Sequence, residues 1–171
     1  MRGGKAQGST TASRKLADLI KATGEYTIEA WVAPGNVAQE EARIVSYSGG
    51  TTTRNFMLGQ TLYSYDFYNR ATGTNTAGDP KLTTSAADED LQATLQHVVA
   101  TYDPIRGRRI YVNGVFTGDA DPAAGGTIEI SLGKGLALIG IGLPTGLAAI
   151  AAGVALGPVG SASLAVIAAP H

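Results

Sequence analysis

Short segments in which apolar and other residues alternate are the feature that most constrains the fold of this chain. The clearest segment covers residues 25–33, where every second position is apolar. Successive side chains of a strand point to opposite faces, so the pattern predicts a strand with two different faces. One face carries Tyr26, Ile28, Ala30 and Val32, and the other carries Thr27, Glu29, Trp31 and Ala33.

Further strand-like segments follow, and clusters of turn residues separate them. We expect strands at 43–47, 55–58, 61–68, 96–102, 109–112, 115–117 and 127–130, and a short one near Leu82. Gly59-Gln60 is the expected turn of one hairpin. Asn113-Gly114 is the strongest hairpin signal, because these residues tolerate the positive φ angles of a tight turn. Short strands with regularly spaced turns predict a mainly β, antiparallel jelly-roll sandwich.

The two ends of the chain differ from this pattern. Residues 1–13 are rich in Gly, Ser and Thr, a composition typical of a mobile segment. A short helix is expected from Ser13 to Ala22, with Ser13 as its cap and Gly24 as its end. We therefore place the sandwich at residues 14–134 and treat residues 135–171 as a separate tail.

The tail contains no charged residue from Gly135 to Pro170. Its Gly-x-x-x-Gly spacings, at 142–146 and 153–157, are typical of closely packed membrane helices. Alanine favours helix and is depleted in strands, so we expect residues 135–169 to be helical, broken near Pro158. The tail is thus a candidate membrane segment. The alternative is that it supplies the last strands of the sandwich.

Composition excludes some classes of protein. The chain has 13 Lys and Arg against 14 Asp and Glu, so it lacks the basic surface that a nucleic acid needs. There is no cysteine, which excludes disulfides and thiolate metal sites. No apolar stretch follows the first residues, so we expect no signal peptide in this chain.

Three stretches resemble the laminin G-like branch of the concanavalin A-like lectin/glucanase superfamily. They are Glu25–Pro34 with its Ile-Glu-Ala-Trp-Val, residues 42–46 followed by 54–60, and residues 95–103 running on to 109–114, with His-Val-Val-Ala-Thr-Tyr-Asp and Tyr-Val-Asn-Gly. The resemblance covers about residues 13–140. It implies a two-sheet jelly roll that lies outside the cell or on its surface and binds glycans or proteins, in some members with calcium.

The tail departs from the family, whose members end with a strand beside the first strand. The sandwich is therefore expected to be incomplete at its C-terminal end. Residues 146–169 weakly resemble a rotary-ATPase proteolipid helix. A proteolipid subunit needs a carboxylate within its apolar helix, and this tail has none. A truncated, chimeric or designed sandwich without a specific ligand also remains open.

Catalysis finds little support in the residues. Glucanases of this superfamily place paired carboxylates on one strand to flank the glycosidic bond. Here Glu29 has Thr27 and Trp31 as its same-face neighbours, and no Glu-x-Asp-x-Glu stretch exists. The internal histidine, His97, lies in a strand and is interpreted as structural. We therefore expect that the chain is not an enzyme and has no catalytic residue.

Metal and glycan sites have more candidates. Calcium binds several oxygen ligands from loops, and the candidate ligands are Asp66, Asp79, Asp119 and Asp121, although Asp also favours turns. Sugars stack on aromatic rings beside polar groups. The candidate ligand-binding residues are Glu29 and Trp31 on one strand, Tyr63, Tyr65 and Tyr68 on another, and Asn69 and Arg70 directly after it.

Trp31 leaves two interpretations open, because it can either form a sugar platform or fill the core. The sequence as a whole predicts a non-catalytic binding or adhesion module for a glycan or an extracellular protein. The tail would tether this module to a membrane through residues 135–169.

Overall fold

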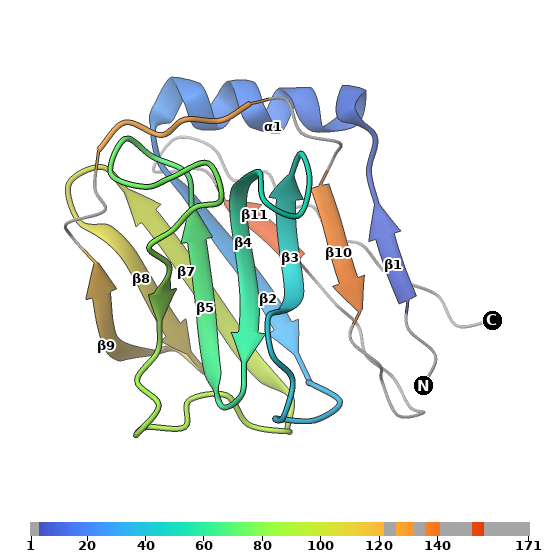
Figure 1. Cartoon of the computed structure of the whole chain (residues 1–171), viewed down its shortest axis with the longest axis vertical. Coiled ribbons are helices and arrows are strands. Elements are labelled where there is room, and N and C mark those ends of the chain that lie inside the picture. The colour runs from blue at the N-terminus through green and yellow to red at the C-terminus, as the bar shows by residue number, and fades with distance from the viewer. Residues whose placement is uncertain (1–3, 122–125, 132–135, 141–151, 156–171) are drawn as a thin grey trace.

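The structure is a computed structural model that describes residues 4–121, 126–131, 136–140 and 152–155. Two antiparallel sheets stack as the layers of a sandwich, and one helix runs along an end of both (Figure 1). The predicted mainly β sandwich is confirmed.

The first sheet has six strands in the order β1-β10-β3-β4-β5-β6, all antiparallel to their neighbours. Their bounds are β1 Gly4–Gln7, β10 Leu136–Gly140, β3 Ala42–Ser48, β4 Arg54–Thr61, β5 Ser64–Asn69 and β6 Leu82–Thr83. The short strand expected near Leu82 is β6, at one edge of this sheet.

The second sheet has five strands in the order β11-β2-β7-β8-β9. Their bounds are β11 Ala152–Ala155, β2 Tyr26–Val32, β7 Gln96–Asp103, β8 Gly107–Val112 and β9 Val115–Asp121. Asn113 and Gly114 both have positive φ angles, 51° and 81°, as the predicted tight turn between β8 and β9 requires.

The hairpin of β4 and β5 turns later than predicted. Gly59 lies inside β4, opposite Arg43 and Asp66, and the turn falls at Leu62 and Tyr63. A Cβ on Gly59 would lie 2.8 Å from the carbonyl oxygen of Ala42. The glycine therefore serves a close approach of two strands rather than a turn.

The helix α1 (Thr10–Thr23) begins before the predicted start at Ser13. Its N-cap is Ser9, whose Oγ accepts a hydrogen bond from the Ala12 amide at 3.0 Å. Ser13 lies inside the helix and is buried. Gly24 ends the helix in the left-handed conformation, as predicted.

Aromatic side chains fill the space between the sheets. Tyr26 of β2 packs on Phe56, Phe67 and Tyr102 with centroid distances of 5.0, 6.1 and 5.8 Å. Its hydroxyl donates to Asn69 Oδ1 at 2.5 Å. Burial raises the pKa of Tyr26 well above its usual value, an effect that the charge of Arg108 partly offsets.

Arg108 of β8 is fully buried between the two sheets. Its guanidinium donates to the carbonyl oxygen of Phe67 at 3.0 Å, to that of Pro80 at 2.7 Å and to Asp121 Oδ2 at 2.6 Å. These bonds join β8 to β5 in the opposite sheet and to the loop before β6. A buried charge is tolerated only with such partners.

The helical prediction for the tail is wrong for the two segments of it that the structure describes. Residues 136–140 form β10, which pairs with β3 on one side and with β1 on the other. Residues 152–155 form β11, which pairs with β2. The unpaired backbone edges of β2 and β3 need hydrogen-bond partners, and this demand overrides the helix preference of alanine. The rest of 135–171 lies outside the described residues.

Other sequence-based boundaries also change. Residues 4–7, predicted to be mobile, form β1 of the six-stranded sheet. Residues 127–130, predicted as a strand, contribute a single bridge between Ala71 and Ile128. Within the described ranges, no helix is long and apolar enough to span a bilayer.

Arg108→Ala should reduce the free energy of unfolding by about 3–5 kcal/mol, because it removes the ion pair with Asp121 and the donors to the Phe67 and Pro80 carbonyl groups. Urea denaturation followed by circular dichroism measures the change. The control is Arg106→Ala in an exposed turn, which should shift the midpoint little. Equal midpoints for the two variants would contradict the role assigned to Arg108.

Deleting residues 141–171 should expose the edge of β2 that β11 covers. β11 pairs with residues 27–30 of β2, and the amide groups of an inner strand point alternately to its two neighbours, so about half of the amides in 27–30 should exchange faster with deuterium. The other half, which face β7, should stay protected. Hydrogen exchange followed by NMR distinguishes the two sets, and unchanged protection in both sets would contradict the pairing of β11 with β2.

Candidate functional site

The outer face of the five-stranded sheet carries an open group of aromatic and polar side chains. We define the aromatic face as Glu29, Trp31, His97, Tyr111 and Phe116. The alternate side chains of β2 point outward, because the strand buries Tyr26, Ile28, Ala30 and Val32 on its inner face. Trp31 is 43% exposed, so the interpretation of Trp31 as a core residue is wrong.

Trp31, His97 and Glu29 form one connected unit. Trp31 lies opposite His97 in the β2–β7 register, and their rings stack at 4.7 Å with an interplanar angle of 29°. His97 Nε2 lies 2.7 Å from Glu29 Oε1. The carboxylate thus fixes the imidazole, and the imidazole supports one face of the indole. The exposed part of Trp31 is therefore its other face and its rim.

The Asn113-Gly114 turn holds the start of β7 in place. The His97 amide donates to Asn113 Oδ1 at 2.9 Å, and the Asn113 amide donates to the His97 carbonyl at 2.7 Å. The same asparagine that allows the tight turn therefore anchors the backbone of a residue of the aromatic face.

The aromatic face continues across the sheet. Glu29, Val99, Tyr111 and Phe116 occupy paired positions on four neighbouring strands. The rings of Tyr111 and Phe116 lie 5.3 Å apart, and Phe116 is 43% exposed. Strands lie about 4.8 Å apart, so the row spans about 14 Å.

The tyrosine candidates do not form a common plate. Tyr65 points into the sandwich, where its hydroxyl donates to Gln96 at 2.8 Å, and burial raises its pKa. Tyr68 lies on the outer face of the six-stranded sheet but is 2% exposed. Tyr63 lies in the turn and is 41% exposed. Residues three apart in a strand face opposite sides, which separates Tyr65 from Tyr68.

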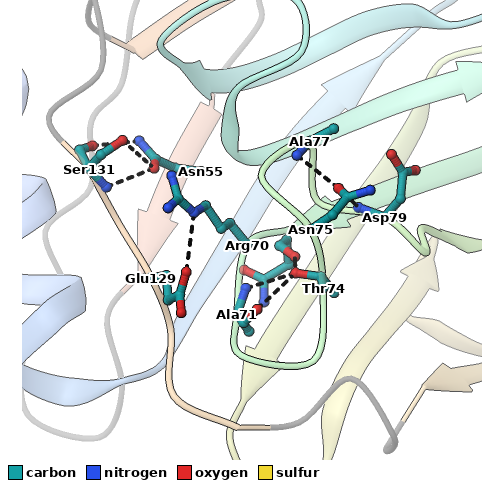
Figure 2. Close-up of polar contacts among 10 residues, drawn as sticks. Asn55, Arg70, Ala71, Thr74, Asn75, Ala77, Asp79, Glu129 and Ser131 are labelled. Atoms are coloured by element: carbon teal, nitrogen blue, oxygen red, sulfur yellow. Dashed lines mark hydrogen bonds and ion pairs between the residues drawn. The ribbon is translucent and has the colours of Figure 1, made fainter.

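Asn69 and Arg70 serve the architecture at the end of β5. Asn69 is buried and accepts the Tyr26 hydroxyl, as described above. Arg70 pairs with Glu129 at 3.4 Å, beside the hydrogen bonds between Asn55 and Ser131 (Figure 2). These contacts attach residues 129–131 to the six-stranded sheet.

The aspartate candidates are dispersed. Asp66 is buried and accepts from Thr61 and Thr83 while it pairs with Lys81 at 2.9 Å. The Asp79 amide donates to Asn75 in a turn (Figure 2). Asp121 pairs with Arg108.

Asp119 accepts from the Ser85 amide at 3.3 Å and lies near Asp90. Burial, followed by the charges of Asp119 and Asp88, raises the pKa of Asp90. In the part of the chain that the structure describes, no group of three or more acidic or histidine side chains is placed to hold a metal ion.

Sequence reasoning missed His97, Tyr111 and Phe116 as members of the aromatic face. The alternation in β7 places His97 and Val99 on the outer face, and this signal was available. The register that brings His97 opposite Trp31 was not, because it depends on which strands are neighbours.

Two stacked antiparallel sheets in these strand orders define a jelly-roll sandwich. A laminin G family model, described as the concanavalin A-like lectin/glucanases superfamily, matches residues 4–140. The chain belongs to this superfamily, as the sequence motifs predicted. No curated protein matches the sequence significantly.

Solved structures with a similar fold include binding domains of botulinum neurotoxins. The serotype D/C VPI 5993 binding domain has a TM-score of 0.51 and 11% identity over 89% of this chain and 34% of that one. The receptor binding domain of the C/D mosaic serotype has a TM-score of 0.51 and 10% identity over 80% and 34%.

The binding domain of neurotoxin DC, solved in complex with rat synaptotagmin II, has a TM-score of 0.50 and 10% identity over 80% and 31%. This chain spans about a third of the length of these binding domains. At identities this low, the structural similarity shows a common fold and nothing about a common ligand.

Trp31→Ala should leave the sandwich folded and reduce its free energy of unfolding by less than about 1 kcal/mol, because the side chain is on the outer face. Tyr26→Ala, on the same strand but in the core, should cost about 3–5 kcal/mol. Chemical denaturation compares the two variants. A larger loss for Trp31→Ala than for Tyr26→Ala would mean that the faces of β2 are assigned in reverse.

Proposed function

We propose that the chain is a non-catalytic binding module that holds a glycan on its aromatic face. The observation that carries this proposal is the exposed, pre-oriented indole of Trp31 next to the Glu29 carboxylate and the His97 ring. A sugar ring offers an apolar C–H face and a rim of hydroxyl groups. An aromatic plate beside polar groups complements both parts.

The rigidity of the plate supports this function. His97 stacks on the indole, Glu29 pairs with His97, and Asn113 holds the backbone of His97. Side chains that are already ordered lose less conformational entropy when a ligand binds. Glu29, whose side chain is 47% exposed, can accept hydrogen bonds from sugar hydroxyl groups.

The length of the aromatic face favours an oligosaccharide. The row from Glu29 to Phe116 spans about 14 Å, which exceeds a single sugar ring. Trp31 would stack on one unit, and Tyr111 with Phe116 would contact a more distant unit. Superfamily membership and the similarity to receptor binding domains support a binding role outside the cell or at its surface.

Titration with neutral oligosaccharides tests the proposal. Trp31 is the single tryptophan of the chain, so its fluorescence reports directly on the site. A glycan array would select the oligosaccharide, and Trp31→Ala should then weaken its binding at least about tenfold, measured by calorimetry. Trp31→Phe should retain part of the affinity, because it keeps a stacking ring.

Tyr63→Ala is the matched control, since it removes an equally exposed aromatic ring outside the aromatic face. It should leave the affinity within about twofold of the original. Equal losses in Trp31→Ala and Tyr63→Ala, or no loss in either, would place the binding site elsewhere. An array on which no glycan binds would reject the glycan proposal.

A further inference from the structure

The outer face of the six-stranded sheet gathers positive charge. Arg43 of β3 and Tyr68 of β5 lie at outward positions of this sheet, and a register shift in the β3–β4 pair lets Arg54 of β4 reach the same face. The Arg54 guanidinium lies over the Tyr68 ring at 4.6 Å, and Lys81 Nζ lies 5.5 Å from the same ring. Two cationic groups therefore lie against one buried tyrosine, and the same tyrosine acts electrostatically on Arg43.

Lys81 is neutralised locally, whereas the two arginines are not. Lys81 pairs with the buried Asp66, which also accepts hydrogen bonds from two threonine hydroxyl groups. Across the described ranges, neither Arg43 nor Arg54 forms an ion pair with a carboxylate. Glu41 acts on Arg43 electrostatically, but it is exposed and makes no ion pair with it.

Backbone carbonyl groups hold both guanidinium groups in position. Arg43 Nη2 donates to the Thr51 carbonyl at 3.3 Å, and Arg54 Nη1 donates to the Ala77 carbonyl at 3.1 Å. The Arg54 amide also donates to the Thr76 carbonyl at 3.0 Å. Thr51 belongs to the turn that leads into Arg54, and the charge of Arg54 acts on the Arg43 guanidinium.

Holding these two guanidinium groups near each other costs free energy when no anion is bound. Partial burial, and then the neighbouring charge of Arg54, lower the pKa of Arg43. The Nε atom of Arg54 is buried and has no acceptor among the residues that the structure describes. Neither guanidinium uses all five of its N–H donors in the contacts described, so donors remain for a ligand.

We propose that Arg43 and Arg54 form a binding site for an oxyanion, the carboxylate or sulfate group of an acidic ligand. Planar guanidinium groups bind such groups through paired N–H donors, and these two are already oriented. The site lies on the opposite outer face of the sandwich from the aromatic face. It therefore stands independently of the proposed glycan function.

NMR of the arginine Nε–H groups in the full chain tests the site. Sodium sulfate and sodium acetate are titrated separately against sodium chloride at equal ionic strength. Saturable shifts of the Arg43 and Arg54 signals, absent with chloride, are expected, and Arg106 should show none. The anion that saturates at the lower concentration identifies the preferred group, sulfate or carboxylate. Equal responses to all three salts would mean that the shifts report only ionic screening, and this result would overturn the proposal.

Two variants test the contribution of each side chain. Arg43→Gln should weaken the binding of the preferred anion about tenfold or more, because it removes a charged donor. The control Arg106→Gln removes the same charge from an exposed turn and should change the affinity less than twofold. Arg54→Lys keeps the charge but loses the planar donor pair, and should also weaken binding. Unchanged affinity in Arg43→Gln would overturn the proposal.

Discussion

The packing of Tyr26 between the two sheets is the interaction on which the rest of the structure depends. Its ring contacts Phe56 and Phe67 of the opposite sheet and Tyr102 of the neighbouring strand, and its hydroxyl reaches Asn69. Because strand side chains alternate, burying Tyr26 also fixes the direction of every other residue of β2. The outward position of Trp31 is a consequence of this core contact.

Buried polar groups also specify how the strands pair. Arg108 joins the two sheets through carbonyl groups and Asp121, and Asp66 gathers two hydroxyl groups and Lys81. A misregistered pairing of the strands would leave these buried groups without their partners. That state costs free energy, because a polar or charged group is costly to bury alone. These contacts therefore favour one register over its alternatives. They also explain why several charged residues that the sequence suggests as ligand-binding candidates have structural roles.

The two outer faces of the sandwich differ in character. The five-stranded sheet leaves aromatic rings and one carboxylate open, whereas the six-stranded sheet buries Tyr68 beneath Arg54 and the loop before β6. Gly78 of that loop approaches the Tyr68 side chain so closely that a Cβ on it would lie 3.1 Å away. One face thus offers stacking surface and the other offers oriented cations, which suits ligands of different chemistry.

The sequence by itself determined the class of fold, the two faces of β2, the Asn113-Gly114 turn and the superfamily. All of these follow from local periodicity, from φ preferences and from short motifs. Only the tertiary structure decided that Trp31 lies outside the core, that His97 stacks on it, and that Gly59 lies within a strand. It also decided that 136–140 and 152–155 are strands rather than helix. The reason is physical: these outcomes depend on which backbone edges and side chains meet across long sequence separations, and local preference carries no such information.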